Sequence, residues 1–291
     1  MIRVGNSPLF RSWTTSVMAL ALTLVVSFSV AQKAPRWKVW ATKADTLYQH
    51  EEFPSAIKAL SKAIRLSGLQ EKESFVLIYR RAVCYYSIGE YNLALKDLDV
   101  FSQKVPDGVQ ASLLRALVYR ELNNTDKQLE YLTQIITTRA PRPELLRWRG
   151  LVYLQKDRFS EARTDLLSAK GLEDDAETET YLGLVYYNLH QTDSALMALN
   201  RAIEMDATYL PPYLYAGSAS LESGNIDLGL QYLNLALKLD PSNKEALYYK
   251  GAALVEQDKT DAGCQCLNRA FYLGMDEAAD YLKEYCFDWE R

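Results

Sequence analysis

The residue types on which most catalytic and metal sites depend are scarce in this chain of 291 residues. It contains two His and four Cys, and no convincing set of zinc ligands can be assembled from them. No glycine-rich phosphate loop and no nucleophile motif occurs. His50 and His190 both fall in predicted turns, where a polar side chain is unremarkable. We therefore expect a protein that is not an enzyme and that binds no cofactor and no metal.

The chain also lacks a basic tract. Its formal net charge is −4, and binding to phosphates needs clustered Lys and Arg, so we expect no nucleic-acid partner. Gly and Pro, with 13 and 9 residues, are too few for a disordered or collagen-like chain. Hydrophobic residues make up 48% of the sequence and supply ample material for a core.

The first 31 residues differ from the rest of the chain. Arg3 and Arg11 are their only charges, residues 17–31 are largely apolar, and Ser29-Val30-Ala31 places small residues at both specificity positions of a signal peptidase. This pattern predicts a secretory signal peptide over residues 1–31, cleaved after Ala31, and export to the periplasm or cell envelope. An uncleaved anchor is the alternative, although spanning a bilayer takes about 20 apolar residues. We expect no membrane insertion of the mature chain, which begins with a short linker at 32–36.

Small residues recur at nearly constant steps along the chain. The intervals between them are 38, 34, 34, 33, 34 and 34 residues, and periods of this length are typical of stacked repeats. In most repeats, large apolar residues four before and three after the small residue share a helical stripe with it. The small residues are Ala44, Ala82, Ala116, Gly150, Gly183, Gly217 and Gly251.

A turn and a second helix follow each of these stripes. Gly89 and Asp157 are typical turn residues, and we expect Thr-Asp pairs such as Thr192-Asp193 to cap the second helix. Twelve residues after most of the small residues comes another small one, and four residues further on comes Leu in every repeat. These leucines are Leu60, Leu98, Leu132, Leu166, Leu199, Leu233 and Leu267.

With the first small residue as position eight of 34, the pattern resembles the tetratricopeptide repeat, a helix–turn–helix unit, and in particular exported tetratricopeptide proteins of bacterial envelopes. The best single match has Tyr213, Gly217, Leu233, Ala236 and Pro241 at the family's characteristic positions. The predicted repeats cover residues 37–277, as 37–70, 75–108, 109–142, 143–175, 176–209, 210–243 and 244–277, and residues 278–291 form a capping helix and tail.

The stretch 109–142 departs most from the family pattern. Ser112, Gln128 and Ile135 replace a bulky and two small residues, and Phe101 replaces a small residue one repeat earlier. We expect looser or altered packing around residues 100–140.

The resemblance implies an all-α, right-handed α-α superhelix, or solenoid, of about seven helix pairs with a C-terminal cap. Three of the four cysteines lie within the last 28 residues, and this clustering suggests a local disulfide bond at the C-terminus. In similar envelope proteins the last second helix lies beside the capping helix, which implies a disulfide between Cys264 and Cys286; three reduced, buried thiols are the alternative. Cys84 is expected to be a buried thiol.

In this family the first helices of the pairs line a concave groove that binds a protein or peptide. Mapped onto this chain, the groove is rich in Tyr and Leu, which suits an extended peptide or a partner helix. Packing between neighbouring helices is the alternative role for each residue. Arg120 and Arg147 could meet an acidic group or pair with neighbours such as Glu121 and Glu144. The predicted groove residues are Tyr79, Tyr86, Leu117, Arg120, Arg147, Leu151, Leu184, Tyr187, Leu221 and Tyr248.

The predicted function is that of a non-catalytic scaffold for protein–protein interaction. A chaperone-like or regulatory receptor for short peptide segments or unfolded chains is the alternative, and self-association is open.

Overall fold

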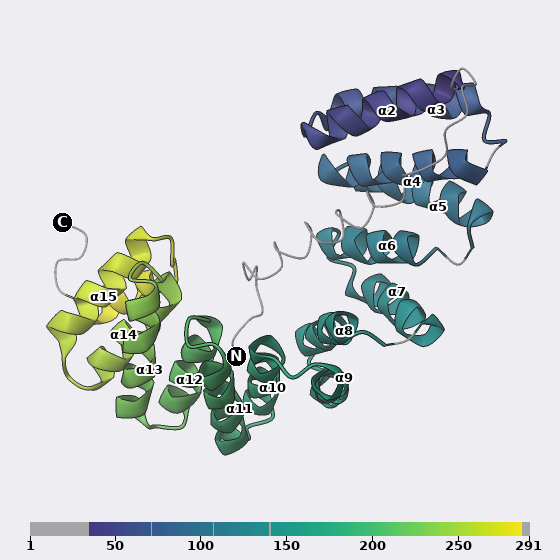
Figure 1. Ribbon diagram of the computed structural model, residues 1–291. Coiled ribbons are helices and arrows are strands. Elements are labelled where there is room, and N and C mark those ends of the chain that lie inside the picture. The colour runs from purple at the N-terminus through teal and green to yellow at the C-terminus, as the bar shows by residue number, and fades with distance from the viewer. Residues whose placement is uncertain (1–34, 71, 107, 140, 287–291) are drawn as a thin grey trace. The chain divides into compact units, whose positions relative to one another are not determined.

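The computed structural model describes residues 35–286 except 71, 107 and 140 (Figure 1). The predicted signal peptide, most of the linker and the tail at 287–291 lie outside the described residues. The described residues form fifteen helices and no strand, which confirms the all-α fold class. Among these helices, none combines the length and the apolar character that crossing a membrane requires.

The chain divides into two compact units at residues 141 and 142. The described part of the N-terminal unit holds α2 (Arg36–Gln49), α3 (Phe53–Ser67), α4 (Lys72–Ser87), α5 (Tyr91–Lys104), α6 (Val109–Glu121) and α7 (Thr125–Thr138). That of the C-terminal unit holds α8 (Pro143–Gln155), α9 (Phe159–Leu172), α10 (Ala176–Asn188), α11 (Thr192–Met205), α12 (Pro211–Glu222), α13 (Ile226–Leu239), α14 (Lys244–Glu256), α15 (Thr260–Tyr272) and α16 (Ala278–Tyr285).

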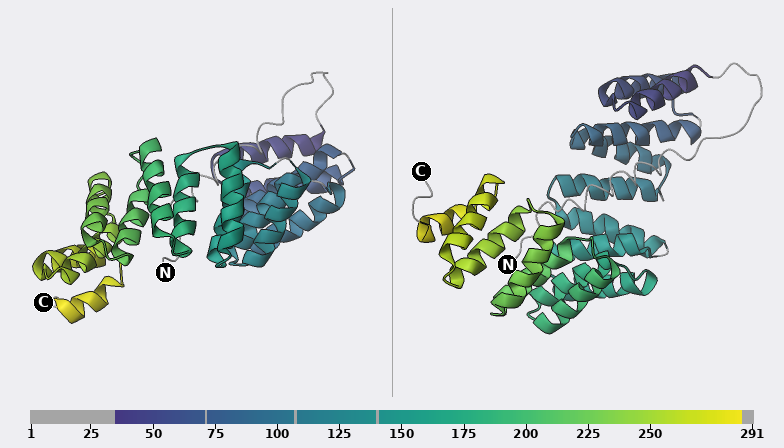
Figure 2. Two further views of the ribbon diagram at one scale, coloured as in Figure 1. Left: turned by 90° about the horizontal axis from the view of Figure 1, so that it is seen from below. Right: turned by 60° about the vertical axis from the view of Figure 1, so that its left-hand side comes forward.

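Helices pack in consecutive pairs, and the densest packing in each unit is between the two helices of a pair, such as α10 with α11 and α14 with α15. Within each unit a second helix also packs on the first helix of the next pair, as α11 does on α12 in the C-terminal unit (Figure 2). An amphipathic helix pair cannot bury its apolar stripe alone, so stacking of neighbours builds a continuous core in each unit.

The small residue at position eight is the point of closest approach inside a pair. Leu199, which is fully buried on α11, lies against Gly183 so closely that a Cβ on Gly183 would be 2.5 Å from its Cγ. Gly217 meets Leu233 and Gly251 meets Leu267 in the same way, at 2.9 and 2.7 Å. In each pair, the leucine that recurs on the second helix therefore fills the space that the glycine on the first helix leaves open.

The turn inside each pair contains one residue with a positive φ, at position fifteen. Gly89 and Gly224 adopt it with φ of 77° and 81°, and His190 and Glu51 with 57° and 59°. Glycine enters this left-handed region without steric cost, whereas other residues tolerate it less well. The sequence pattern identified the turns, and His190 occupies one of them as an exposed structural residue.

The predicted capping role of the Thr-Asp pairs is wrong. Thr125, Thr192 and Thr260 are the first residues of their helices, and at the start of α7 the side chain of Asn124 accepts from the Lys127 backbone N–H at 3.1 Å. The residue before each threonine lies outside the helical backbone region and is the capping position, so this position falls one residue earlier than the sequence suggested.

Two helix pairs are held by an ion pair that the repeat pattern did not indicate. Arg149 on α8 binds both oxygens of Asp165 on α9, each at 2.7 Å, and Arg81 on α4 binds Asp97 on α5 with the same distances. Both aspartates are buried, at 5% and 6% exposure. A bidentate pair in this position fixes the lateral register of the two helices.

Around residues 100–140 the packing is altered, as the departures from the repeat pattern led us to expect. The Phe101 ring packs on Tyr79, with centroids 5.5 Å apart, and its edge approaches the backbone at Gly108. The bulky ring takes the place of a small residue, and α5 packs more sparsely on α6 than α3 does on α4. Gln128 and Ile135 are nonetheless buried.

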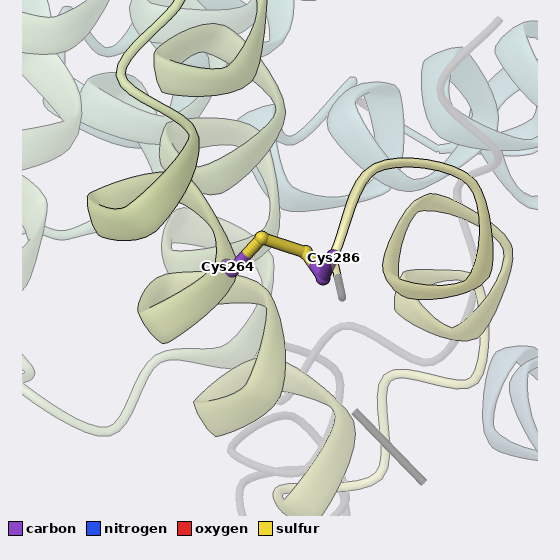
Figure 3. The surroundings of a disulfide bond; sticks show 2 residues. All are labelled: Cys264 and Cys286. Carbon is purple, nitrogen blue, oxygen red and sulfur yellow. A yellow bond between two sulfur atoms is a disulfide. The ribbon is translucent and has the colours of Figure 1, made fainter. Parts of the chain in front are cut away.

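The C-terminal end of the stack is closed by α16. This helix packs on α15 and also contacts α14, so it occupies the place of a further first helix. A disulfide joins Cys264 on α15 to Cys286 immediately after α16, with the Cα atoms 5.8 Å apart (Figure 3). Cys84 is a buried free thiol and Cys266 a half-buried one.

Gly183→Ala tests the close approach inside a pair. We expect a loss of about 1–3 kcal/mol of stability, because the added methyl group overlaps a leucine that has no free space to move into. Gly171→Ala is the matched control on the exposed side of α9, where a Cβ meets nothing within 4 Å; it should stabilise by about 0.5–1 kcal/mol. Urea unfolding measures both, and equal effects would contradict the close approach.

The bidentate pair is tested by removing one partner or both. Arg149→Met should cost about 3–5 kcal/mol, because it leaves the Asp165 carboxylate buried without its cation. Arg149→Met with Asp165→Leu should recover most of that loss, since no buried charge is left. A double variant as unstable as the single variant in thermal unfolding would show that the ion pair itself carries the stability.

Candidate functional site

One face of each unit is formed by first helices alone, and we call it the first-helix face. Within the C-terminal unit, α8 contacts α10, α10 contacts α12, α12 contacts α14 and α14 contacts α16. Second helices show no comparable packing against each other in the described part of the chain. The first helices thus converge while the second helices spread apart, and this makes the first-helix face the inner side of the stack.

Tyrosines at position six form a row along this face in the C-terminal unit. Tyr181, Tyr215 and Tyr249 come from α10, α12 and α14, and each hydroxyl is close enough to the next for an electrostatic interaction. Burial raises the pKa of Tyr215 to about 12 and that of Tyr181 further still. These hydroxyls are therefore protonated at neutral pH and act as neutral hydrogen-bonding groups rather than as acids or bases.

Arg147 anchors one end of the face. Its guanidinium is 6% exposed and is paired with the Asp175 carboxylate; Nη1 also donates to Thr178 Oγ1 at 3.2 Å. The carboxylates of Glu177 and Glu173 lie 3.4 and 3.7 Å away. With three carboxylates around one buried cation, Arg147 ties α8 to α10 and the loop before it, and its charge is already balanced.

The pKa of Glu177 shows that the surroundings of Arg147 are strongly desolvated. Burial raises the pKa of its carboxyl group, although the Arg147 charge acts in the opposite direction. The Tyr181 hydroxyl donates to Glu177 Oε1 at 3.2 Å.

The middle of the face is built around Tyr187 and Glu222. The Tyr187 ring is 8% exposed, and its hydroxyl has no hydrogen-bond partner of normal geometry within the described residues. Burial raises the pKa of Tyr187, and so do the charge of Glu222 and hydrogen bonding to it, whereas hydrogen bonding to Ser218 acts in the opposite direction. Glu222 itself is exposed at the end of α12. A buried, unsatisfied hydroxyl beside an exposed carboxylate is a polar feature open to a ligand group.

At the capped end, tyrosines from α14 and α16 form an edge-to-face cluster. The Tyr248 ring lies 5.4 Å from that of Tyr249 and 5.8 Å from that of Tyr281, and Tyr285 continues the series at 5.8 Å. The carboxylates of Glu277 and Asp280 help to raise the pKa of Tyr248 after burial. This half-buried cluster offers aromatic edges and faces within a negative field.

The N-terminal unit has its own polar group on the first-helix face. Arg120 Nη2 binds Glu121 at 2.7 Å and donates to the Tyr86 hydroxyl at 3.4 Å. Burial raises the pKa of Tyr86 to about 12. Arg120 therefore pairs with Glu121, which was one of the two roles that the sequence left open.

A small hollow in the same unit lies between α2, α3 and α4. The Asp45 carboxylate pairs there with the Arg80 guanidinium, which also donates to the Ala41 carbonyl at 3.3 Å. Burial raises the pKa of the Cys84 thiol to about 11, so this thiol is protonated and unreactive at neutral pH. The hollow is lined by Ala44, Asp45, Tyr48, Leu60, Arg80, Val83 and Cys84.

The residues predicted for the groove fall into two groups. Four are half-buried: Tyr86, Arg120, Tyr248 and Leu221, of which Leu221 packs on Gly229 of the second helix α13. The other six are buried between helices: Tyr79, Leu117, Arg147, Leu151, Leu184 and Tyr187. Leu184 is 0% exposed and belongs to the core, whereas Tyr187 is buried with a polar atom on the face.

Sequence reasoning missed the tyrosine row and most of the carboxylates. The signal was present, since position six is aromatic in four successive repeats, at Trp148, Tyr181, Tyr215 and Tyr249. The face is acidic because carboxylates near the helix ends point toward it. The repeat pattern does not show in which direction those side chains point.

Nothing in the described residues resembles a catalytic or metal site. No group of three or more His, Cys, Asp or Glu side chains that could hold a metal ion occurs within residues 35–286, gaps aside. His50 and His190 are both exposed at turns.

Comparison with known proteins agrees with this architecture. Residues 214–270 match the family model described as tetratricopeptide repeat. Human tetratricopeptide repeat protein 13 is 25% identical over 150 residues, which are 49% of this chain and 17% of that protein. This chain thus spans only a small part of the length of that curated relative.

Solved structures share the fold at low sequence identity. A tetratricopeptide repeat protein from Parabacteroides merdae matches with a TM-score of 0.70 and 15% identity, over 86% of this chain and 97% of that one. The C-terminal part of a repeat-containing protein from Cytophaga hutchinsonii matches with a TM-score of 0.62 and 17% identity, over 83% and 98%.

Stacked helix pairs with an inner face of first helices define the class of helical repeat proteins. Within that class, residues 214–270 match the tetratricopeptide repeat model, and the fold is that of solved tetratricopeptide repeat proteins. Proteins with this fold are generally scaffolds for protein–protein interaction, and the fold supports that role here.

Proposed function

We propose that the protein is a non-catalytic scaffold that binds a partner protein along the first-helix face. The observation that carries this proposal is the surface at the capped end of the C-terminal unit. There Tyr248, Tyr249 and Tyr281 are half-buried, which leaves part of each ring open to a partner. Tyrosine is among the residues most often found to dominate binding energy at interfaces.

The face is also preorganised for binding. Its residues lie on helices whose spacing is fixed by the close contacts inside each pair and by the packing of α10, α12, α14 and α16. Binding to such a surface costs little conformational entropy, because the surface is already ordered. Several modest contacts can therefore give a stable complex. Ring edges and hydroxyls then select the orientation of the partner.

We further propose that the mature protein works outside the cytoplasm, in the periplasm or cell envelope. The charged start, apolar middle and Ser29-Val30-Ala31 end of the leader support this location. The disulfide between Cys264 and Cys286 supports it as well, since oxidising compartments preserve such bonds.

Charge-introducing variants test the binding face. In the source organism, in-cell crosslinking followed by quantitative mass spectrometry should recover a partner with the native chain. Tyr248→Asp should lower that recovery at least tenfold, because it places an unpaired carboxylate in the aromatic cluster. Met197→Asp is the matched control, since Met197 is 71% exposed on the second helix α11, and it should leave recovery unchanged. Loss with Met197→Asp alone would place the interface on the second helices.

Fractionation tests the location. We expect a mature protein that starts at Gln32 and is recovered outside the cytoplasm, with Cys264 and Cys286 resistant to alkylation until a reductant is added. Ala31→Arg should block processing and leave the longer chain. A cytoplasmic, full-length protein with both thiols open to alkylation would contradict export.

A further inference from the structure

Tyr187 is one of several buried polar groups of the C-terminal unit whose hydrogen bonding is incomplete. Its hydroxyl, which comes from α10, interacts with Glu222 and Ser218 of α12, but neither contact has the geometry of a full hydrogen bond. Leaving a buried polar atom unsatisfied costs roughly 1–3 kcal/mol, so such an atom in a stable fold needs a reason. A ligand group that completes its hydrogen bonds is one such reason.

We propose that this position binds a cationic side chain, an arginine or a lysine, from a basic segment of the partner protein; the inference rests on the function proposed above. Tyr187 and Glu222 form the contact point. The Glu222 carboxylate accepts N–H groups of the cation, and the Tyr187 oxygen accepts another. The Tyr187 O–H donates to the Glu222 carboxylate, so each of these groups has a hydrogen-bond partner when the cation is bound.

The charges around this point favour a cation and oppose an anion. Carboxylates of Glu222, Glu245 and Glu277 all act on the Tyr249 hydroxyl, and those of Glu277 and Asp280 act on Tyr248. An acidic segment would be repelled by all four.

Some cations of the neighbouring elements already have partners. Lys244 Nζ donates to the Gly274 carbonyl at 2.9 Å, and Arg147 is surrounded by three carboxylates. The four carboxylates outnumber the lysines of α14 and α16, which are Lys244, Lys250 and Lys283, so the charge around Tyr248 and Tyr249 stays negative.

The aromatic cluster adds a second element of recognition. A guanidinium or ammonium group over a tyrosine face gains about 0.5–1 kcal/mol when exposed and more when desolvated. Tyr248, Tyr249 and Tyr281 present rings next to the carboxylates, so a basic segment laid from α12 toward α16 meets carboxylate and aromatic contacts in succession. Because arginine combines a planar fork with good stacking, we expect it to bind more tightly than lysine.

Fluorescence anisotropy with synthetic peptides tests the proposal directly. The probes are fluorescein-labelled peptides of five Gly-Arg or five Gly-Glu repeats, titrated with the purified protein at low and at moderate salt. We expect the arginine peptide to bind at least tenfold more tightly than the glutamate peptide. Glu222→Gln and Tyr187→Phe should each weaken it about tenfold, since each removes a hydrogen bond to a charged group.

Two controls separate recognition from general effects. Glu204→Gln removes the same charge from the exposed surface of the second helix α11, and it should change the affinity less than twofold. Tyr187→Phe should leave the melting temperature equal or slightly higher, because it removes an unsatisfied buried hydroxyl.

Equal losses in Glu222→Gln and Glu204→Gln would overturn the proposal, as would a native protein that binds both peptides alike. A Tyr187→Phe variant with a lower melting temperature and full affinity would also overturn it, since the hydroxyl would then be structural. If these results appear while Tyr248→Asp still abolishes capture of the natural partner, the scaffold function stands and only the basic segment is wrong.

Discussion

The structure depends on the contact between a small residue of one helix and a leucine of the next. Where Gly183 meets Leu199, and Gly251 meets Leu267, the two helices of a pair lie so close that even a methyl group is excluded. Repetition of this contact every 33 to 38 residues makes the helix pairs similar in shape, and similar pairs stack in a regular way. The order of helices in each unit follows from this local constraint.

A surface for binding is the consequence of that stacking. The first helices approach one another while the second helices do not, so side chains from α10, α12, α14 and α16 gather on one side. The residues gathered there are tyrosines and carboxylates, and the buried Arg147 is neutralised by its own neighbours. Such a surface offers a partner contact area and negative charge, which is the basis of the proposed binding.

The sequence predicted most of the fold and part of the site. The helix pairs could be predicted from the spacing of Gly150, Gly183, Gly217 and Gly251. Only a small residue fits where the two helices of a pair come closest, so these positions are visible in the sequence. It gave no sign of the Arg149–Asp165 pair, which needs two residues 16 apart to face each other across a turn. The pattern also placed Leu184 on the groove, whereas the structure buries it completely between helices, because burial depends on the neighbouring pair as well as on the position in the repeat.

The central claim is that a partner covers the first helices at the capped end of the C-terminal unit. Hydroxyl-radical footprinting of the protein, alone and with its captured partner, measures this coverage for each tyrosine. The account predicts that Tyr248 and Tyr281 become protected while Tyr272, which is 81% exposed on the second helix α15, reacts as before. Protection of Tyr272 with unchanged reactivity of Tyr248 and Tyr281 would contradict it.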